Sequence, residues 1–424
     1  RNAVTAGEAP PLTTLDLLVD SCLDLFRIVV IDLDANDDAQ VIFEVLNGRQ
    51  TRLTSADLVK NLLFLRAESS GPSEVDELYD RYWSRFDDQW WKKVVGRGHA
   101  ARRHTDLMLA AWLTAIDEEP GHPDRLYGHV RRLVDRGHTS VPDLLAQIAM
   151  YAEHYRSFRG VRPVEDPRIR TAYDRLRALG AVTVLPLVLW LRDQRLTAAT
   201  ESRALVALES YMVRRAAIGA GTRQYQQVFR DVLSRAKEAI DEGEPADLAV
   251  EKGLLALEAN VWPRDEEVRE AFVSRRYYGN VAAYMIRLLF AGIEEQLKTE
   301  NQLTEQTAVP YDALTIEHIM PQSWREHWPI RALTEPEQIL AEQRREAHLH
   351  RFGNLTLLNG ALNAHQSNAP WSEKRHTLAE HSALRLNADL ATNPVWDTWD
   401  EQRIVERGEF LAAVACRAWP RPTD

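Results

Sequence analysis

Two stretches near the C-terminal end decide the fold expected for this part of the chain: 314-LTIEHIMPQSW-324 and 351-RFGNLTLLNGALN-363. The first is a short apolar strand pattern that carries Glu317 and His318 side by side and stops at a proline. The second contains a turn glycine, a β-type run over residues 355–358, and then a stretch that can be helical as far as Pro370. Together they predict the order strand, loop, strand, helix.

The polar residues of these stretches suit metal-dependent hydrolysis of a phosphodiester. The imidazole of His318 has an ordinary pKa near the working pH, so it can take a proton from water. Glu317 and Asn363 supply oxygen atoms for a hard divalent cation, predicted to be Mg²⁺ or Mn²⁺, which would neutralise charge on the phosphate and on the departing 3′ oxygen. The amide of Asn354 could hold the ring of His318 in its productive orientation. We therefore predict two catalytic residues, His318 and Asn354, and two metal ligands, Glu317 and Asn363.

Each of these residues also has an ordinary structural explanation. A Glu-His pair on a strand is usually a satisfied surface pair, and an asparagine after glycine is usually a turn residue. The order of the four residues, the Pro-Gln pair after the histidine, and the interval of about nine positions between the two asparagines favour the functional interpretation.

The runs 317-EHIMPQ-322, 353-GNLTLL-358 and 362-LN-363 resemble the HNH nuclease domain of the GmrSD-type, modification-dependent restriction endonucleases. The bacterial SspE proteins share that layout, and the HNH domain of RNA-guided nucleases is similar. The segments 262-WPRD-265 and 275-RRYY-278 also resemble the lead-in to the nuclease domain in this family.

This resemblance implies a ββα-metal fold and the roles already given for the four polar residues, with the histidine as general base. The family pattern continues through Lys374 and Arg375, which are candidates for contacts with DNA phosphates or for a structural role. The resemblance further implies DNA as the partner, phage or modified DNA above all, and a defence role in which a modified base or a phosphorothioate backbone is recognised. The sequence does not choose between those two modifications.

An N-terminal stretch resembles a second domain of the same proteins. The runs 42-IFEVLN-47 and 57-DLVKN-61 are similar to the later half of their ParB-like domain. In that family the domain hydrolyses nucleotide through an Asp-Gly-Gln-Gln-Arg motif, which this sequence lacks, and there is no P-loop. We expect the first part of the domain to be missing. Its nucleotide-binding residues are unknown, and whether it takes a nucleoside triphosphate is left open.

The length of 424 residues indicates two or three domains. Apolar residues spaced by three and four predict helices through the middle of the chain, for example over residues 141–155, 201–218, 225–240 and 281–297. We predict a mainly α, multi-domain protein with a partial α/β, ParB-like part over residues 1–70, a helical linking domain over 71–300 and an HNH nuclease domain over 301–424.

Composition limits the classes of function. A net charge of −11 argues against a protein that coats DNA indiscriminately, although a local basic groove would still serve a DNA enzyme. Cys22 and Cys416 form no CxxC pair, so a zinc site with cysteine ligands is not expected and a reducing cytoplasm fits. No apolar run approaches the ~20 residues of a membrane helix, so no membrane partner is expected. A homo-oligomer is compatible with the sequence.

Seven of the thirteen histidines follow residue 300, which raises a histidine-based metal site as an alternative. His348 and His350, however, are two positions apart in a predicted helix, and such side chains point to different faces. We therefore predict that both lie on a coil surface.

The function predicted from the sequence is a metal-dependent DNA endonuclease of bacterial anti-phage restriction that senses DNA modification and nicks or cleaves DNA. One rival is a DNA-binding regulator or scaffold that keeps the HNH fold without cleaving. Another is a purely helical protein-interaction module, for which the four polar residues would be accidents of sequence.

Overall fold

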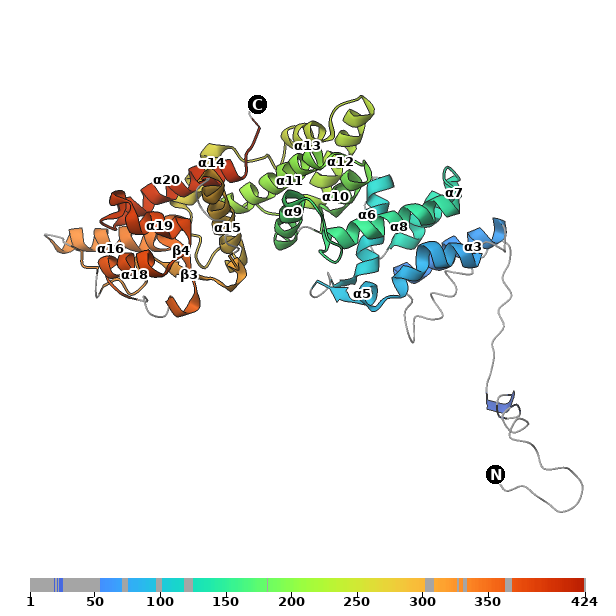
Figure 1. Ribbon diagram of the computed structural model, residues 1–424, viewed down its shortest axis with the longest axis horizontal. Helices are drawn as coiled ribbons and strands as arrows, with labels where there is room; N and C mark the ends of the chain where they lie inside the picture. The colour runs from blue at the N-terminus through green and yellow to red at the C-terminus, as the bar shows by residue number, and fades with distance from the viewer. Residues whose placement is uncertain are drawn as a thin grey trace, which may run out of the picture. The chain divides into compact units, whose positions relative to one another are not determined.

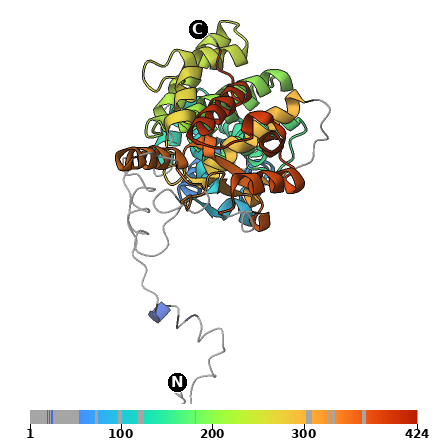
Figure 2. The same cartoon turned by 90° about the vertical axis from the view of Figure 1, so that its left-hand side faces the viewer.

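The computed structural model describes most of the chain beyond residue 53. Its contacts divide the chain into two units, Arg1–Thr54 and Ser55–Asp424, and the helices and strands from α3 onward belong to the second unit (Figures 1 and 2). Most of the predicted ParB-like part, including residues 42–47, lies outside the described residues. The described residues are 54–70, 75–96, 101–117, 125–180, 182–301, 309–325, 328–330, 334–362 and 368–422, together with 19, 21 and 23–25.

Helices make up most of the described structure, which confirms the mainly α prediction. In the described residues the strands form two antiparallel pairs, β1 (Val94–Val95) with β2 (Arg102–Arg103) and β3 (Thr315–His318) with β4 (Leu355–Leu358). None of the helices in the described part combines the length and the apolar character that a membrane crossing requires.

A first hydrophobic core runs through the helices between α3 (Ser55–Ser70) and α13 (Ala246–Leu255). Three of these helices confirm predicted ones: α8 (Val141–Phe158), α11 (Ala198–Ile218) and α12 (Tyr225–Asp241) correspond to the helices predicted over 141–155, 201–218 and 225–240. The same core also contains side chains from α6 (His104–Asp117), α7 (Leu126–Arg136), α9 (Pro167–Ala178) and α10 (Leu185–Asp193).

The ends of α11 follow from its sequence. The side chain of Thr197 accepts a hydrogen bond from the backbone of Thr200 and so caps the first turn. Gly219 ends the helix with φ 78°, a left-handed conformation that glycine adopts without steric cost. This long helix connects the first core with the segment that comes after it, because it also contacts α14 (Asp265–Ser274).

A second hydrophobic core contains side chains from α14, from α15 (Ala283–Glu300) and from α20 (Glu401–Ala418), as well as the inward residues of β4. The predicted helix over 281–297 is thus confirmed as α15. Residues 265–300 share this core with β4, although the predicted domain boundary lay near residue 300. The boundary stays a prediction, because the compact unit Ser55–Asp424 is not divided further.

The short 3-10 turn η7 (Phe352–Asn354) brings the start of β4 against α20. A Cβ atom on Gly353 would lie 2.0 Å from the backbone oxygen of Ile404 in α20, so only glycine allows this approach. The buried guanidinium of Arg407 in α20 donates hydrogen bonds to the carbonyls of Gly353 and Leu355. The Gly-Asn-Leu run is therefore clamped from one side by a helix that begins about fifty residues later in the chain.

The pair β3 and β4 confirms both strands predicted from the opening stretches. His318 lies opposite Leu355, and Glu317 opposite Thr356. The polar interval between the strands contains a helix, α16 (Glu335–Leu349), and α18 (Trp371–His381) and α19 (Arg385–Thr392) come after β4. Figure 1 shows these elements around the strands. Of the helix predicted after residue 360, only residues 360–362 are described, and they are helical.

Candidate active site

Glu317 and His318 are the last two residues of β3, so their side chains leave opposite faces of the strand. The residue His318 is 5% exposed, and the side chain of Glu317 is 14% exposed. The acid–base pair predicted at a strand end therefore sits at the edge of the protein interior and has other side chains around it on both faces.

The imidazole of His318 contacts two other rings. Its Nε2 atom lies 3.2 Å from Nδ1 of His350, and the ring of Tyr278 meets it edge-on at a centroid distance of 4.5 Å. Burial lowers the pKa of His318 to about 3, with smaller contributions from His350 and Lys374. The ring is consequently neutral at physiological pH, which is the form that can accept a proton.

The carboxylate of Glu317 is paired with a buried lysine. Lys374 Nζ lies 2.9 Å from Glu317 Oε1 and 2.8 Å from the carbonyl oxygen of His318. Lys374 is 2% exposed, and burial lowers its pKa while Glu317 acts in the opposite direction. The ammonium therefore ties the end of β3 to α18 and compensates the negative charge of the predicted metal ligand.

Arg375, the neighbour of Lys374, also points inward. Its guanidinium donates to the carbonyls of Leu390 and Asn393 and forms an ion pair with Asp397. Lys374 and Arg375 were both predicted as candidates for contact with DNA, but in the structure each of them has partners within the protein. Their placement supports the structural alternative that the sequence left open, and the lysine is too deeply buried here to reach a phosphate.

Asn354 is fully buried and its carboxamide makes four hydrogen bonds. Oδ1 accepts from the backbone of Met320 and from Nε1 of Trp399, while Nδ2 donates to the carbonyls of Met320 and Leu349. These bonds use the whole donor and acceptor capacity of the amide. The amide of Asn354 therefore does not make the predicted direct contact with the His318 ring. It bonds instead to the backbone of Met320, which follows His318, and to that of Leu349, which precedes His350.

Asn363, the second predicted metal ligand, lies outside the described residues, as do residues 364–367. Over the described ranges no group of three or more His, Cys, Asp or Glu side chains could hold a metal ion. Glu317 nevertheless provides the donor chemistry that Mg²⁺ prefers, since this ion is commonly held by one or two carboxylates and keeps several waters. Among the described residues, Glu317 thus offers one carboxylate toward such a cation, with its Oε1 already 2.9 Å from Lys374 Nζ.

The whole of this geometry lies within one recognisable segment. Residues 262–414 match the family model of the GmrSD restriction endonucleases, C-terminal domain. The chain carries a GmrSD C-terminal domain. This confirms the resemblance of the C-terminal part to the GmrSD restriction endonucleases, a family whose name implies DNA as its substrate, while the HNH type and the ParB-like N-terminal part stay predictions. Among curated proteins the comparison gives no match.

The GmrSD domain contains two site residues that the sequence did not identify, His350 and Tyr278. His350 was predicted to lie on a coil surface, but it is half-buried against His318 and comes directly after the end of α16. Tyr278 belongs to the 275-RRYY-278 lead-in, whose position beside the strands only the fold reveals. A signal did exist, because that segment and the C-terminal excess of histidines both stand out in the sequence.

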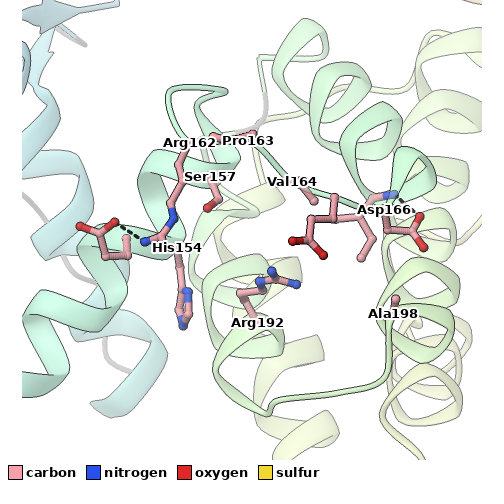
Figure 3. Close-up of a pocket in the computed structure, with 11 residues that line it drawn as sticks. His154, Ser157, Arg162, Pro163, Val164, Asp166, Arg192 and Ala198 are labelled. Atoms are coloured by element: carbon pink, nitrogen blue, oxygen red, sulfur yellow. Dashed lines mark hydrogen bonds and ion pairs between the residues drawn. The ribbon is translucent and has the colours of Figure 1, made fainter.

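A cavity of about 700 Å³ lies outside the GmrSD domain, in the helical part, and Figure 3 shows its side chains. It is formed between α8, the loop after α8, α9 and α10. Its charged groups largely compensate one another, since Arg162 pairs with Glu153 and Arg192 with Glu201. None of the predicted site residues lines it, and its mixed charge favours neither an anion nor a cation.

Proposed function

We propose that the GmrSD domain is a metal-dependent DNA endonuclease of the HNH type in which His318 is the general base. The observation that carries this proposal is the neutral, buried imidazole at the end of β3, adjacent in the strand to Glu317 and inside the matched segment. A neutral imidazole can take a proton from water, and a carboxylate oxygen can hold a divalent cation.

The proposed reaction is a single displacement at phosphorus. His318 removes a proton from a water molecule, whose oxygen attacks the phosphorus atom. The bond from phosphorus to the 3′ oxygen breaks, and that oxygen takes a proton from solvent, which leaves a 5′ phosphate and a 3′ hydroxyl. The negative charge of the bound DNA raises the pKa of His318 from its value in the free protein, because a nearby anion favours the imidazolium form.

Glu317 and Asn363 would hold Mg²⁺ or Mn²⁺, which when bound neutralises negative charge on the phosphate. The contribution of Lys374 is to orient the carboxylate of Glu317, through the 2.9 Å contact with Oε1. Asn354 holds the backbone at Met320 and Leu349, so the turn after His318 and the end of α16 keep their separation.

The biological setting that we infer is bacterial defence against phage DNA in the cytoplasm. Sensing of a modified base or of a phosphorothioate backbone is part of this proposal, and it rests on the GmrSD relationship rather than on a described contact. Cleavage of modified and unmodified plasmid by the full chain, side by side, tests it. Equal rates on both substrates would remove modification sensing from the proposal and leave the nuclease.

The test of the nuclease is nicking of supercoiled plasmid by His318→Ala in the presence of Mg²⁺ or Mn²⁺. We expect a loss of about 100- to 10,000-fold, the range typical of a general base, with DNA binding and folding unchanged. His348→Ala is the matched control, because the ring of His348 bonds the carbonyl of Arg344 in its own helix and no contact of this ring with His318 is found among the described residues. Nicking by His318→Ala at the rate of the control would remove His318 from the mechanism.

A second candidate function is favoured by the closed state of the site. His318 is 5% exposed and Glu317 is already paired with a lysine, as expected for a DNA-binding protein that keeps this fold without cleaving. Such a protein would bind DNA equally well with EDTA or with Mg²⁺, and it would leave supercoiled plasmid intact at any metal concentration.

A further inference from the structure

The contact between His318 and His350 joins two specific ring nitrogens, Nε2 of the first and Nδ1 of the second, at 3.2 Å. A neutral imidazole has one N–H donor and one nitrogen that can accept. In such a contact one ring donates and the other accepts, so the contact also decides which nitrogen of His318 remains able to accept a proton on its other side.

The position of His350 is fixed by elements on both sides of it. Asn354 Nδ2 donates to the carbonyl of Leu349, and the backbone nitrogens of Tyr277 and Tyr278 approach the carbonyl oxygen of His350 at 2.8 and 3.2 Å. The ring of Tyr278 lies nearly parallel to that of His350, at 13° and 5.7 Å, while its edge contacts His318. The second histidine is therefore held in place by a turn of the lead-in segment.

Only one arrangement of the protons leaves His318 able to act as a base. If His350 donated through Nδ1, the acceptor nitrogen of His318 would be used up and its Nδ1 would carry the proton. If His318 donates from Nε2 instead, its Nδ1 keeps the lone pair and stays available to a water molecule. The second arrangement is the one that general-base catalysis requires.

We propose that His350 is a positioning residue that accepts a hydrogen bond from Nε2 of His318 and thereby makes Nδ1 the nitrogen that takes the proton from water. This inference rests on the proposed function. His350 stays neutral throughout: when Nδ1 of His318 gains the proton, the Nε2–H group of the resulting imidazolium remains donated to His350. The arrangement resembles the way in which the third member of a catalytic triad holds the tautomer of its histidine.

The tautomer can be measured without any cleavage. In the full chain labelled with ¹⁵N-histidine, protonated and unprotonated imidazole nitrogens give well-separated ¹⁵N shifts, and the His318 signals are identified by their loss in His318→Gln. We expect Nε2 of His318 to be protonated and Nδ1 unprotonated in the wild type. A wild-type protein with Nδ1 of His318 protonated would overturn the proposal, whether or not it cuts DNA.

Substitutions of His350 separate positioning from a general structural effect. In His350→Leu the acceptor is lost, and we expect mixed tautomers at His318. In His350→Asn the amide oxygen can take the place of Nδ1, so the wild-type tautomer should return. His348→Leu and His348→Asn are the matched controls, two positions earlier in the last turn of α16. An unchanged tautomer in a folded His350→Leu variant would overturn the proposal.

Plasmid nicking gives the second readout. We expect His350→Leu to lower kcat by about 10–100-fold with little change in KM, the loss typical when the outer partner of a functional histidine is removed, and His350→Asn to recover most of it. If His318→Ala is inactive but His350→Leu nicks normally, the positioning role of His350 is wrong while the proposed nuclease function stands. If His318→Ala nicks normally, the proposed function fails, and the tautomer measurement still decides whether the two rings are paired as described.

Discussion

The carboxamide of Asn354 has a partner at each of its four hydrogen-bonding positions, and all four lie in the interior. Removing the side chain would take away the hydrogen-bond partner that Asn354 provides to the backbone of Met320, to the carbonyl of Leu349 and to the indole of Trp399. Buried polar groups without partners cost about 1–3 kcal/mol each, so single residues of this kind can dominate the stability of a site.

We therefore expect Asn354→Ala to lower the free energy of unfolding by about 3 kcal/mol or more, as measured by urea denaturation. Plasmid nicking should fall as well, because the same amide spaces the turn after His318 from the end of α16. The exposed Asn280 is the control, and Asn280→Ala should change stability by no more than about 0.5 kcal/mol. Equal effects of the two substitutions would show that the network contributes little.

A second residue-scale prediction concerns pH and a histidine far along the chain from the nuclease site. His104 opens α6, is 3% exposed, lies flat against Trp90, and contacts the hydroxyl of Tyr155 at 2.8 Å. Burial lowers the pKa of His104 to about 4, with smaller contributions from Arg159 and Lys93. The folded protein therefore binds this proton less readily than the unfolded chain does.

The sign of the pH effect is set by that difference. Above an unfolded pKa of about 6.5 both states are neutral at His104, and as the pH falls toward about 4 only the unfolded chain takes up the proton. The wild type should thus lose up to about 3 kcal/mol of stability over this range relative to His104→Phe, which cannot titrate. Urea denaturation of both proteins at several pH values checks this, and parallel curves would contradict it.

At the scale of elements, the backbone of η7 packs closely against the backbone of α20. The Cβ of an alanine at residue 353 would meet the carbonyl oxygen of Ile404 at 2.0 Å and the backbone nitrogen of Gly408 at 2.8 Å. Backbone atoms of a packed helix cannot yield as a flexible side chain can. The helix and the turn would have to separate, and β4 begins directly after that turn.

Gly353→Ala should accordingly destabilise the protein by about 3 kcal/mol or more, through overpacking that side-chain rearrangement cannot relieve. Gly360→Ala is the matched control from the same stretch of sequence, because a Cβ there meets nothing within 4 Å. The control should be neutral or slightly stabilising, since alanine restricts the unfolded chain. Thermal and urea unfolding of both variants measure the difference, and similar losses would rule out the clamp as its cause.

At the scale of the molecule, Arg214 joins α11 to the start of the matched segment and to the residues just beyond its end. Its side chain is 2% exposed; the guanidinium donates to the carbonyls of Trp419, Pro263 and Cys416 and pairs with Asp265. The indole of Trp419 also bonds Glu209 of α11. Pro263 and Asp265 lie within the matched residues 262–414, Cys416 and Trp419 follow them, and all these contacts lie within one compact unit.

Arg214→Ala should therefore cost about 3 kcal/mol or more, because a buried side chain that bonds the carbonyls of Pro263 and Cys416 and pairs with Asp265 is lost. The carbonyl of Trp419 keeps a second donor, the hydroxyl of Ser210. We also expect the single unfolding transition to broaden or split, since the two parts would lose a shared contact. Arg168→Ala is the control, because that arginine is 67% exposed in a surface ion pair and contributes little. A sharp, unshifted transition for Arg214→Ala would mean that the two parts are coupled by other contacts.

What the sequence determined by itself is local. A short apolar strand pattern and a β-type run predicted β3 and β4, and the spacing of three and four predicted α8, α11, α12 and α15. The adjacency of Glu317 and His318 placed an acid–base pair at a strand end. Such patterns are readable because each depends on neighbours within one turn of helix or a few strand residues. The family relationship was readable for the same reason, since its motifs are short and contiguous.

Only the tertiary structure decided which distant residues meet at the site. His350 contacts His318 across 32 positions of sequence, and Lys374 contacts Glu317 across 57. The amide of Asn354 bonds the backbone of Met320 and not the imidazole of His318. These outcomes depend on where α16 ends, on how α18 packs and on the clamp of α20 over Gly353. Contacts of this kind are set by the packing of whole elements, because no local preference of one side chain can select a partner that far along the chain.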